Sequence, residues 1–312
     1  MFFTKRGDEI TFACHVFEIE GDVVIKSCFI KFIMIVHGSH YTTGVGRKCE
    51  TIGSQFVAFI SDIHANYTAL MAVGAHAKSL GCKKFICCGD SIGLGPSPNE
   101  VLDWLRKKEV PTVRGNVDYN IARIVKRQKR YIRKGKFEKY VSYGHTWNVL
   151  SDVNRKFLKS MPERVEQKVG GLEILAVHGL PHDVDGGLHS GLARRDGDRM
   201  LKTLGCQVLA AGHIHQPFVE ERPLGLLLNC GSVGCYGASP PTATYVLLTI
   251  KEGKASGRVY WVTYDNRSLY LAYEKAGLPR ELADFYCEGR LPTSKERRLL
   301  SSHCESGVYR AR

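Results

Sequence analysis

Short apolar runs, each followed at once by a polar or glycine-rich loop, are the feature of this sequence that most constrains its fold. Runs at residues 56–60, 84–88, 172–177 and 206–211 have the length and composition of buried strands. Helical stretches separate the first of them, and this alternation of strand and helix is typical of an α/β sheet. We therefore expect an α/β fold whose regular part begins near residue 56.

The other segments extend this pattern. Residues 99–108 predict a helix, and so do residues 67–80, which have one apolar face made by Leu70, Val73, Ala77 and Leu80. Shorter apolar runs predict further strands at 111–113, 224–230 and 244–250. The last two stretches, 258–264 and 268–274, alternate polar and apolar residues as exposed or edge strands do.

Side chains that can bind a metal follow these predicted strands. They are Asp62, His64, Asp90, Asn116, His178, His213 and His215. Because ligand sites in α/β sheets are assembled at the carboxyl ends of strands, we expect these residues to converge. Carboxylate, imidazole and amide oxygen together suit divalent manganese, iron, nickel or zinc better than calcium. A single DxH or HxH motif often arises by chance, whereas the whole ordered set indicates a metal site.

The motifs DxH, GD, GN, H and GHxH, in that order, resemble the calcineurin-like metallophosphoesterase superfamily, in particular its small predicted phosphodiesterases and phosphatases of bacteria and archaea. The segments GDSIGLGPSPNEVLDWL, AVHGLPHD and NCGSVG are similar to the surroundings of the ligands in that subgroup, and the resemblance covers residues 56–270. It implies a four-layer α-β-β-α sandwich of two mixed sheets flanked by helices.

The resemblance also implies a role for each metal-binding position. One ion would be held by Asp62, His64 and His215, the other by Asn116, His178 and His213, and Asp90 would bridge them. Asp90, Asn116 and His213 are at the same time the predicted catalytic residues. Two bridged ions about 3.5 to 4 Å apart polarise a phosphoryl group and generate hydroxide at neutral pH. We expect manganese, with iron, nickel or zinc as alternatives.

One position departs from the pattern of the superfamily. Many members have GNHD or GNHE, where the histidine is thought to protonate the leaving group or bind phosphate, but this chain has Val117 there. Since valine transfers no proton, we expect substrates with good leaving groups. His145 and His182 are candidate replacements, with surface or structural histidines as the alternative. Asp118 would then cap the following helix, and Asn66 is either a positioning residue or a helix cap.

Positive charge is concentrated in one segment. The chain has a formal charge of +13, and residues 119–150 contain nine basic residues and one acidic residue. Ile121, Ile124, Val125, Gln128 and Ile132 recur at helical spacing there, which predicts an amphipathic helix near the Asn116 loop. Its basic face is either simply solvated or guides an anionic substrate, a nucleotide or oligonucleotide among them. No aromatic array for reading bases accompanies it.

Composition and cysteine usage bound the remaining questions. We expect an N-terminal extension over 1–55, a catalytic domain over 56–275 and a basic tail over 276–312 that forms a short helix and a frayed end. The 11 cysteines form no CxxC pair, which favours free thiols in a reducing cytoplasm. No apolar run approaches the roughly 20 residues that span a bilayer, and the first residues do not resemble a signal peptide.

Three functions are compatible with these observations. A dinuclear metal-dependent phosphodiesterase, in which a metal-bridging hydroxide attacks phosphorus, is the favoured one. A protein or nucleotide phosphatase would use the same site on another substrate, and a metal-binding scaffold would have lost catalysis. The intact set of predicted ligands argues against the scaffold. The sequence leaves the physiological substrate open, as well as assembly into a homo-oligomer.

Overall fold

The structure is a computed structural model that describes residues 3–6, 9–12, 30–33, 54–234 and 242–312. The chain forms two compact units, Met1–Gly46 and Arg47–Arg312. The described part of the first is an antiparallel sheet in the order β1-β2-β3, made of β1 Phe3–Arg6, β2 Glu9–Phe12 and β3 Ile30–Ile33. The boundary that we expect at residue 55 lies next to residues outside the described ranges and stays a prediction.

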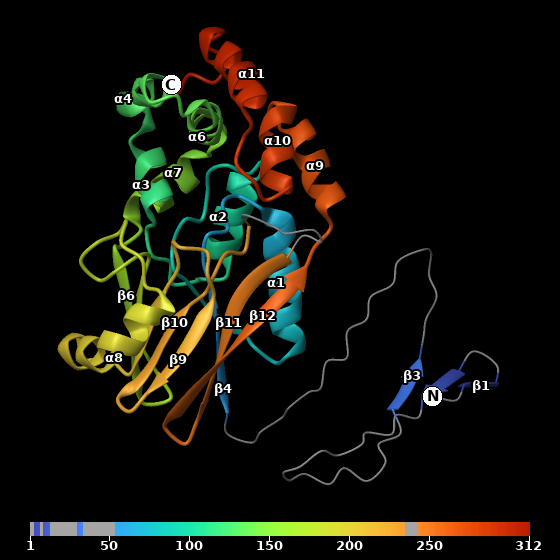
Figure 1. The fold of residues 1–312 in the computed structure, drawn as a ribbon, viewed down its shortest axis with the longest axis vertical. Coiled ribbons are helices and arrows are strands. Elements are labelled where there is room, and N and C mark those ends of the chain that lie inside the picture. The colour runs from blue at the N-terminus through green and yellow to red at the C-terminus, as the bar shows by residue number, and fades with distance from the viewer. Residues whose placement is uncertain (1–2, 7–8, 13–29, 34–53, 235–241) are drawn as a thin grey trace. The chain divides into compact units, whose positions relative to one another are not determined.

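Two mixed sheets form the centre of the second unit (Figure 1). One has the order β12-β11-β4-β5, from β4 Gln55–Ile60, β5 Lys84–Cys87, β11 Thr242–Lys251 and β12 Lys254–Thr263. The other has the order β6-β7-β8-β10-β9, from β6 Arg164–Val169, β7 Leu172–Val177, β8 Val208–Ala211, β9 Phe218–Arg222 and β10 Gly225–Asn229. Parallel pairs join β4 to β5 and β7 to β8, which confirms the expected α/β class.

Alternation along β4 explains why the two sheets pack face to face. Val57 and Phe59 point into the core between the sheets, whereas Ala58 and Ile60 point to the opposite side. All four are at most 1% exposed. A strand that is apolar on both faces is stable only when both faces are covered, so the continuous run at 56–60 requires a layer on each side of its sheet.

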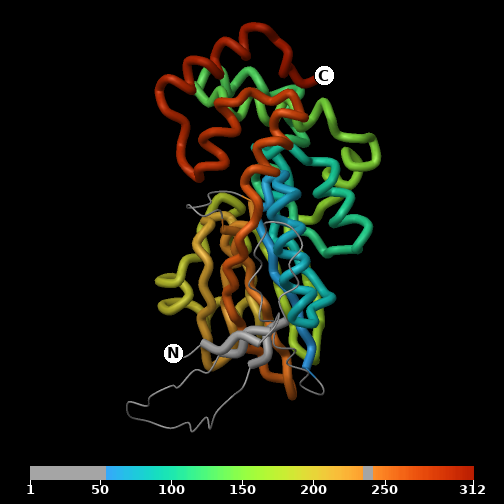
Figure 2. The backbone as a smooth tube through the Cα atoms, turned by 90° about the vertical axis from the view of Figure 1, so that its right-hand side faces the viewer, coloured from blue at the N-terminus to red at the C-terminus, as the bar shows by residue number. Residues whose placement is uncertain are grey.

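Helices supply the two outer layers. The helices α1 Tyr67–Ser79 and α2 Pro98–Lys107 pack on the outer face of the four-stranded sheet, where Leu70 and Leu102 join one core with Ala58. The helix α8 Ser190–Leu204 covers the outer face of the other sheet through Ala193 and Leu201. Figure 2 shows the sheets edge-on between these helices. The result is the expected α-β-β-α sandwich.

The basic segment after residue 116 is broken into short helices instead of forming one amphipathic helix. These are α3 Asn116–Ala122, α4 Ile124–Arg127, α5 Lys129–Arg133 and α6 Phe137–Val149. Because each break shifts the helical phase, Ile121 and Ile124 are buried while Val125 and Ile132 are exposed. The prediction of a single packed face was therefore wrong, although the helical character was right. The helix α7 Asp152–Ser160 follows.

A second correction concerns residues 268–274, which form a helix and not a strand. The helix α9 Asn266–Lys275 begins at Asp265, whose side chain accepts a hydrogen bond from the Arg267 amide. Leu269 and Tyr273, four residues apart, are its buried positions. The alternation of polar and apolar residues in this segment is also compatible with that i, i+4 spacing. The preceding strand was correctly expected, since residues 258–263 lie in β12.

The C-terminal segment is packed and does not end in a frayed stretch. It forms α10 Arg280–Cys287 and α11 Ser294–Glu305, and the start of α11 has a capping box between Thr293 and Glu296. The Gln128 side chain donates to the Tyr309 carbonyl at 2.6 Å and accepts from the Ala311 amide at 2.7 Å. These partners lie more than 180 residues apart in the sequence, so no local pattern predicts the contact.

None of the helices in the described ranges combines the length and apolar character that a membrane-spanning segment needs. Seven cysteines fall in these ranges, and all seven are buried free thiols. Five of them, Cys82, Cys87, Cys88, Cys206 and Cys230, lie in a strand or within two residues of one. Buried thiols of this kind act as small apolar side chains in the cores.

We predict that the C-terminal packing contributes substantially to stability. Leu300, which is fully buried, and its neighbour Leu299, which is 41% exposed, make a matched pair. Leu300→Ala should lower the free energy of unfolding by about 2 to 5 kcal/mol through the cavity that it leaves. Leu299→Ala should change it by about 0.5 kcal/mol or less. Urea denaturation followed by circular dichroism measures both, and equal effects of the two substitutions would contradict the packing described here.

Candidate metal centre

The predicted ligands lie at the carboxyl ends of strands in both sheets. Asp62 and His64 follow β4, and Asp90 follows β5. In the other sheet, His178 comes directly after β7, and the His213 loop follows β8. Asn116 is the first residue of α3, just after Thr112, which pairs with Cys87. Since the parallel pairs point their carboxyl ends the same way, these loops meet at one end of the sandwich.

The first group is formed by Asp62, His64 and His215. The Nε2 atom of His215 lies 3.0 Å from Asp62 Oδ1, and Nε2 of His64 lies 3.8 Å from the same oxygen. The two rings are tilted, with centroids 5.4 Å apart. Asp62 and His64 are buried, whereas His215 is partly exposed, so this group is open to solvent on the side of His215.

Asp90 connects this group with a second one. Its Oδ2 lies 3.4 Å from His178 Nε2 and 4.0 Å from His64 Nε2, which places the carboxylate between the two histidines. Ligand atoms of Asp62, Asp90 and His178 all lie within 4.8 Å of one another, as do those of Asp62, His64 and His215. The two candidate groups are therefore contiguous, and they share Asp62.

Asn116 and His213 complete the second group around His178. Asn116 Oδ1 and His213 Nδ1 each lie 3.2 Å from His178 Nε2. On the other side of the same ring, Nδ1 lies 2.9 Å from the carbonyl oxygen of Cys88 and donates to it. That bond orients the His178 ring so that its Nε2 points at the cluster, as is usual for histidines that bind metals. All seven sequence-predicted ligands thus meet in one cluster.

The backbone of the cluster is strained. Five of the predicted ligands have positive φ: Asp62, His64, Asp90, His213 and His215. Residues with side chains rarely adopt this left-handed region, which costs on the order of 1–3 kcal/mol per residue. Such strain persists only where the surrounding structure fixes it, and it is concentrated at functional sites.

Close backbone approach explains the glycines in the GN and GH motifs. A Cβ atom at Gly115 would overlap the Asp90 carboxylate, and one at Gly212 would overlap the Ser61 hydroxyl and crowd Asp62. The same approach lets the Val117 amide donate to Asp90 Oδ1 at 2.8 Å and the His213 amide donate to Asp62 Oδ2 at 2.9 Å. Each carboxylate is thus held by one backbone amide and has its other oxygen left for the cluster.

The electrostatics follow from two buried carboxylates among histidines. Burial would raise the pKa of Asp62, but His215, His178 and His64 outweigh it and hold that pKa below its usual range. Burial lowers the pKa of His178, but Asp90 and Asp62 raise it to about 10. For His64 burial dominates and lowers the pKa to about 4. The carboxylates therefore stay ionised in the interior, where they need cationic partners.

Asn66 and Asp118 have structural partners. The Asn66 side chain accepts from the Ala69 amide at 2.9 Å as the cap of α1, and it donates to the Gly234 carbonyl at 3.2 Å. Asp118 accepts from the amides of Ser91, Ile92 and Gly115 at 3.2, 3.2 and 3.0 Å. Burial and the charge of Asp90 raise its pKa to about 7. Asp118 thus ties the loop of Asp90 to the start of α3.

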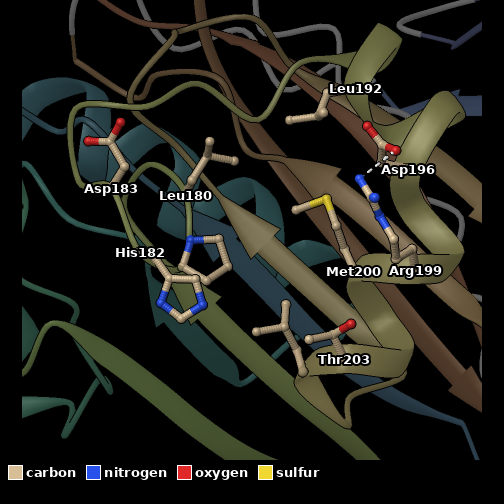
Figure 3. A pocket seen from close by; sticks show the side chains of 10 residues that line it. Leu180, His182, Asp183, Leu192, Asp196, Arg199, Met200 and Thr203 are labelled. Carbon is tan, nitrogen blue, oxygen red and sulfur yellow. Dashed lines mark hydrogen bonds and ion pairs between the residues drawn. The ribbon is translucent and has the colours of Figure 1, made fainter.

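His145 and His182 have their described contacts outside the cluster. His145 lies on α6, with its ring centroid 6.4 Å from that of Tyr309, and burial lowers its pKa. His182 lines a cavity of about 390 Å³ beside Leu180 and Met200 (Figure 3). Among the described contacts, none joins either histidine to a predicted ligand, so their role as replacements for the missing histidine stays a prediction.

Asp185 is a functional candidate that the sequence did not single out. Its Oδ1 accepts from Asn116 Nδ2 at 3.0 Å, and its carbonyl oxygen lies 3.1 Å from His213 Nε2. The first bond orients the amide so that its oxygen faces His178. The available signal was its place in HGLPHDVDGG, on the loop that begins with a predicted ligand.

The segment of the chain that contains this cluster, residues 56–253, matches the calcineurin-like phosphoesterase superfamily domain. The chain belongs to this superfamily. An uncharacterized protein of Methanocaldococcus jannaschii is 30% identical over 251 residues, which cover 75% of this chain and 98% of that protein. Membership and the donor set of carboxylates, imidazoles and an amide together imply divalent metal ions.

Solved structures with the same fold come from archaea and bacteria. A hypothetical protein from Pyrococcus horikoshii has a TM-score of 0.66 at 22% identity, and it covers 76% of this chain and 99% of its own. A metallophosphoesterase from Sphaerobacter thermophilus has a TM-score of 0.60 at 22% identity, with the same coverage of both chains. At this level of identity the likeness concerns the fold.

We predict that Asp185 supports metal binding through Asn116. Asp185→Ala should weaken Mn²⁺ binding about 10-fold, because residues that orient a ligand typically contribute that much. Isothermal titration calorimetry on the full chain measures the affinity. Asp152→Ala, which removes a carboxylate that is 88% exposed on α7, is the control and should leave the affinity unchanged. Equal affinities of Asp185→Ala and wild type would show that Asn116 needs no such support.

Proposed function

We propose that this protein is a dinuclear metal-dependent phosphodiesterase. The observation that carries the proposal is the single, partly buried cluster in which two ionised carboxylates face four histidines and an amide oxygen. One ion would be held by Asp62, His64 and His215, the other by Asn116, His178 and His213, with Asp90 between them. When bound, two such ions polarise a phosphoryl oxygen and lower the pKa of water.

The chain's own residues position the reaction. Asp90 reaches both groups with one oxygen while the Val117 amide holds the other. Asn116 is oriented by Asp185, and His213 is placed by its amide bond to Asp62. These contacts keep the three proposed catalytic residues, Asp90, Asn116 and His213, in place before the substrate binds. Preorganisation of this kind accounts for much of the rate enhancement of enzymes, because the groups need not reorganise during the reaction.

Val117 supports a diester over a monoester with a poor leaving group. Its side chain is 7% exposed and packs in the same core as Ile121. An apolar group there offers the departing oxygen no proton, so turnover is expected with groups that leave without protonation. The alternatives, a protein or nucleotide phosphatase and a metal-binding scaffold, share the cluster. The intact set of predicted ligands argues against the scaffold. We expect manganese as the bound metal and the cytoplasm as the location of the protein.

A direct assay tests the activity. With added Mn²⁺, the full chain should hydrolyse bis-p-nitrophenyl phosphate faster than p-nitrophenyl phosphate, and Asp90→Ala should lose at least about 100-fold in kcat/KM. Release of nitrophenolate is followed by absorbance, with the metal content of each preparation measured alongside. No turnover of either compound by metal-loaded protein would refute the enzyme and favour the scaffold. Unchanged turnover in Asp90→Ala would place the activity elsewhere.

A second test restores the missing proton donor. Val117→His should raise kcat/KM for an alkyl phosphate, a poor leaving group, by about 100-fold, because a positioned general acid contributes 10²–10⁴-fold. The rate with bis-p-nitrophenyl phosphate should change little. Val117→Gln, a polar side chain of similar size that transfers no proton, is the matched control. If both variants behave alike, the identity of residue 117 does not set the leaving-group preference.

A further inference from the structure

A basic cavity lies at the end of α3 that is farther from the metal centre. It has a volume of about 470 Å³, and Arg123, Lys126, Arg127 and Lys159 line it together with Trp147. No acidic side chain is among its lining residues. The cations come from two places in the chain, the stretch Arg123–Arg127 at the junction of α3 and α4 and Lys159 on α7, so the fold adds Lys159 to a local group of three.

These cations lack the acidic partners that other basic residues have. Arg106, Arg155 and Arg222 each pair with an aspartate within 3.6 Å. Among the described residues, the four cations of the cavity form no ion pair with a carboxylate. Arg123 stacks on the ring of Tyr119 at 4.4 Å, and Lys159 lies 5.3 Å from the ring centroid of Trp147. Positive charge gathered in this way attracts an anion.

The helix α3 links the cavity to the metal centre. Asn116, Tyr119 and Arg123 recur at i, i+3 and i+7, so they share one face of the helix. Val117 and Ile121 on another face are buried. The seven residues of α3 span about 10 Å at 1.5 Å per residue. A substrate that touches Asn116 and extends along this face therefore reaches Arg123 and the cavity within a short distance.

We propose that the cavity binds the backbone phosphates of a single-stranded oligonucleotide. Cleavage of the oligonucleotide at the metal centre rests on the proposed function, whereas binding of the oligonucleotide to the cavity does not. At the axial rise of about 3.4 Å per nucleotide of a stacked strand, the length of α3 corresponds to at most about three nucleotides, and an unstacked strand spans it with fewer. A flexible single strand can direct one phosphate to the buried cluster while its neighbours stay on the surface, which a rigid duplex cannot. The contacts are to phosphates, so binding is independent of sequence.

Binding is tested without turnover. Fluorescence anisotropy of a fluorescein-labelled oligothymidylate is measured on the full chain without added metal, over a salt series, with the probe checked for cleavage. Lys126→Ala/Arg127→Ala should weaken binding about tenfold at low salt and reduce the slope of log K against log salt by about 0.7 per lost contact. Arg194→Ala/Lys202→Ala, which removes two exposed cations on α8, is the matched control and should bind like wild type.

The outcomes separate the proposal from its alternatives. The proposal would be overturned if Lys126→Ala/Arg127→Ala bound the oligonucleotide with the affinity and the salt dependence of the wild type. Equal losses in both double variants would overturn it as well, because net charge alone would then explain binding. Tighter binding of a duplex than of the single strand would also reject it. Equal thermal midpoints of the two double variants establish that a loss of affinity reflects lost contacts and not unfolding.

A chain-length series tests the link to the metal centre. With Mn²⁺, KM should fall as the oligonucleotide is lengthened from two nucleotides until more than about three nucleotides lie beyond the cleaved bond. Lys126→Ala/Arg127→Ala should abolish this length dependence, and the α8 control should retain it. If Lys126→Ala/Arg127→Ala retained the length dependence, the cavity would not contribute to substrate binding at the metal centre. If no substrate is cleaved, the proposed function fails, and the anisotropy experiment still decides whether the cavity binds the strand.

Discussion

The metal centre depends on two carboxylates, Asp62 and Asp90, that remain charged in the interior of the protein. Removing such groups from water is costly, and the surrounding chain offsets that cost with backbone amides and histidines. The need to bring those partners close accounts for much of the local structure. It explains why five of the predicted ligands adopt left-handed backbone conformations and why glycine precedes Asp90, Asn116 and His213. At this end of the sandwich a hydrogen bond from the His213 amide to Asp62 joins the loops of the two sheets.

The same loops also connect the metal centre to the helices that surround it. Asp118 joins the Asp90 loop to α3 through three amides. From there α3 leads to the basic cavity, and Gln128 and Trp147 connect that helical region to the C-terminal residues. The helices added after β12 are therefore part of the same packed unit as the metal centre.

Local sequence patterns predicted most of the strands and the first helices, because those elements are apolar on the faces that they bury. They missed β6 and β9, and the strand expected at 111–113 is only an isolated bridge at Thr112. The limits of β7 and the apolar face of α1 agree with the expectation. Predictions failed where two periods fit one segment, as in α9, or where the helical phase was interrupted, as after Arg123. They also failed for the C-terminal residues, whose partners are remote. In each case the contact that decides the structure lies outside the local window.

The sequence by itself determined the class of fold, the superfamily and the set of candidate metal-binding side chains, because each candidate ligand follows an apolar strand in a fixed order. It also showed that Val117 stands where many relatives have histidine. Only the tertiary structure decided that Asp185 supports Asn116, that Asn66 and Asp118 have structural partners, and that four cations surround one cavity. These facts depend on distances between residues far apart in the chain. The periodicity of a strand indicates which of its faces is buried, but it does not indicate which residues pack against that face.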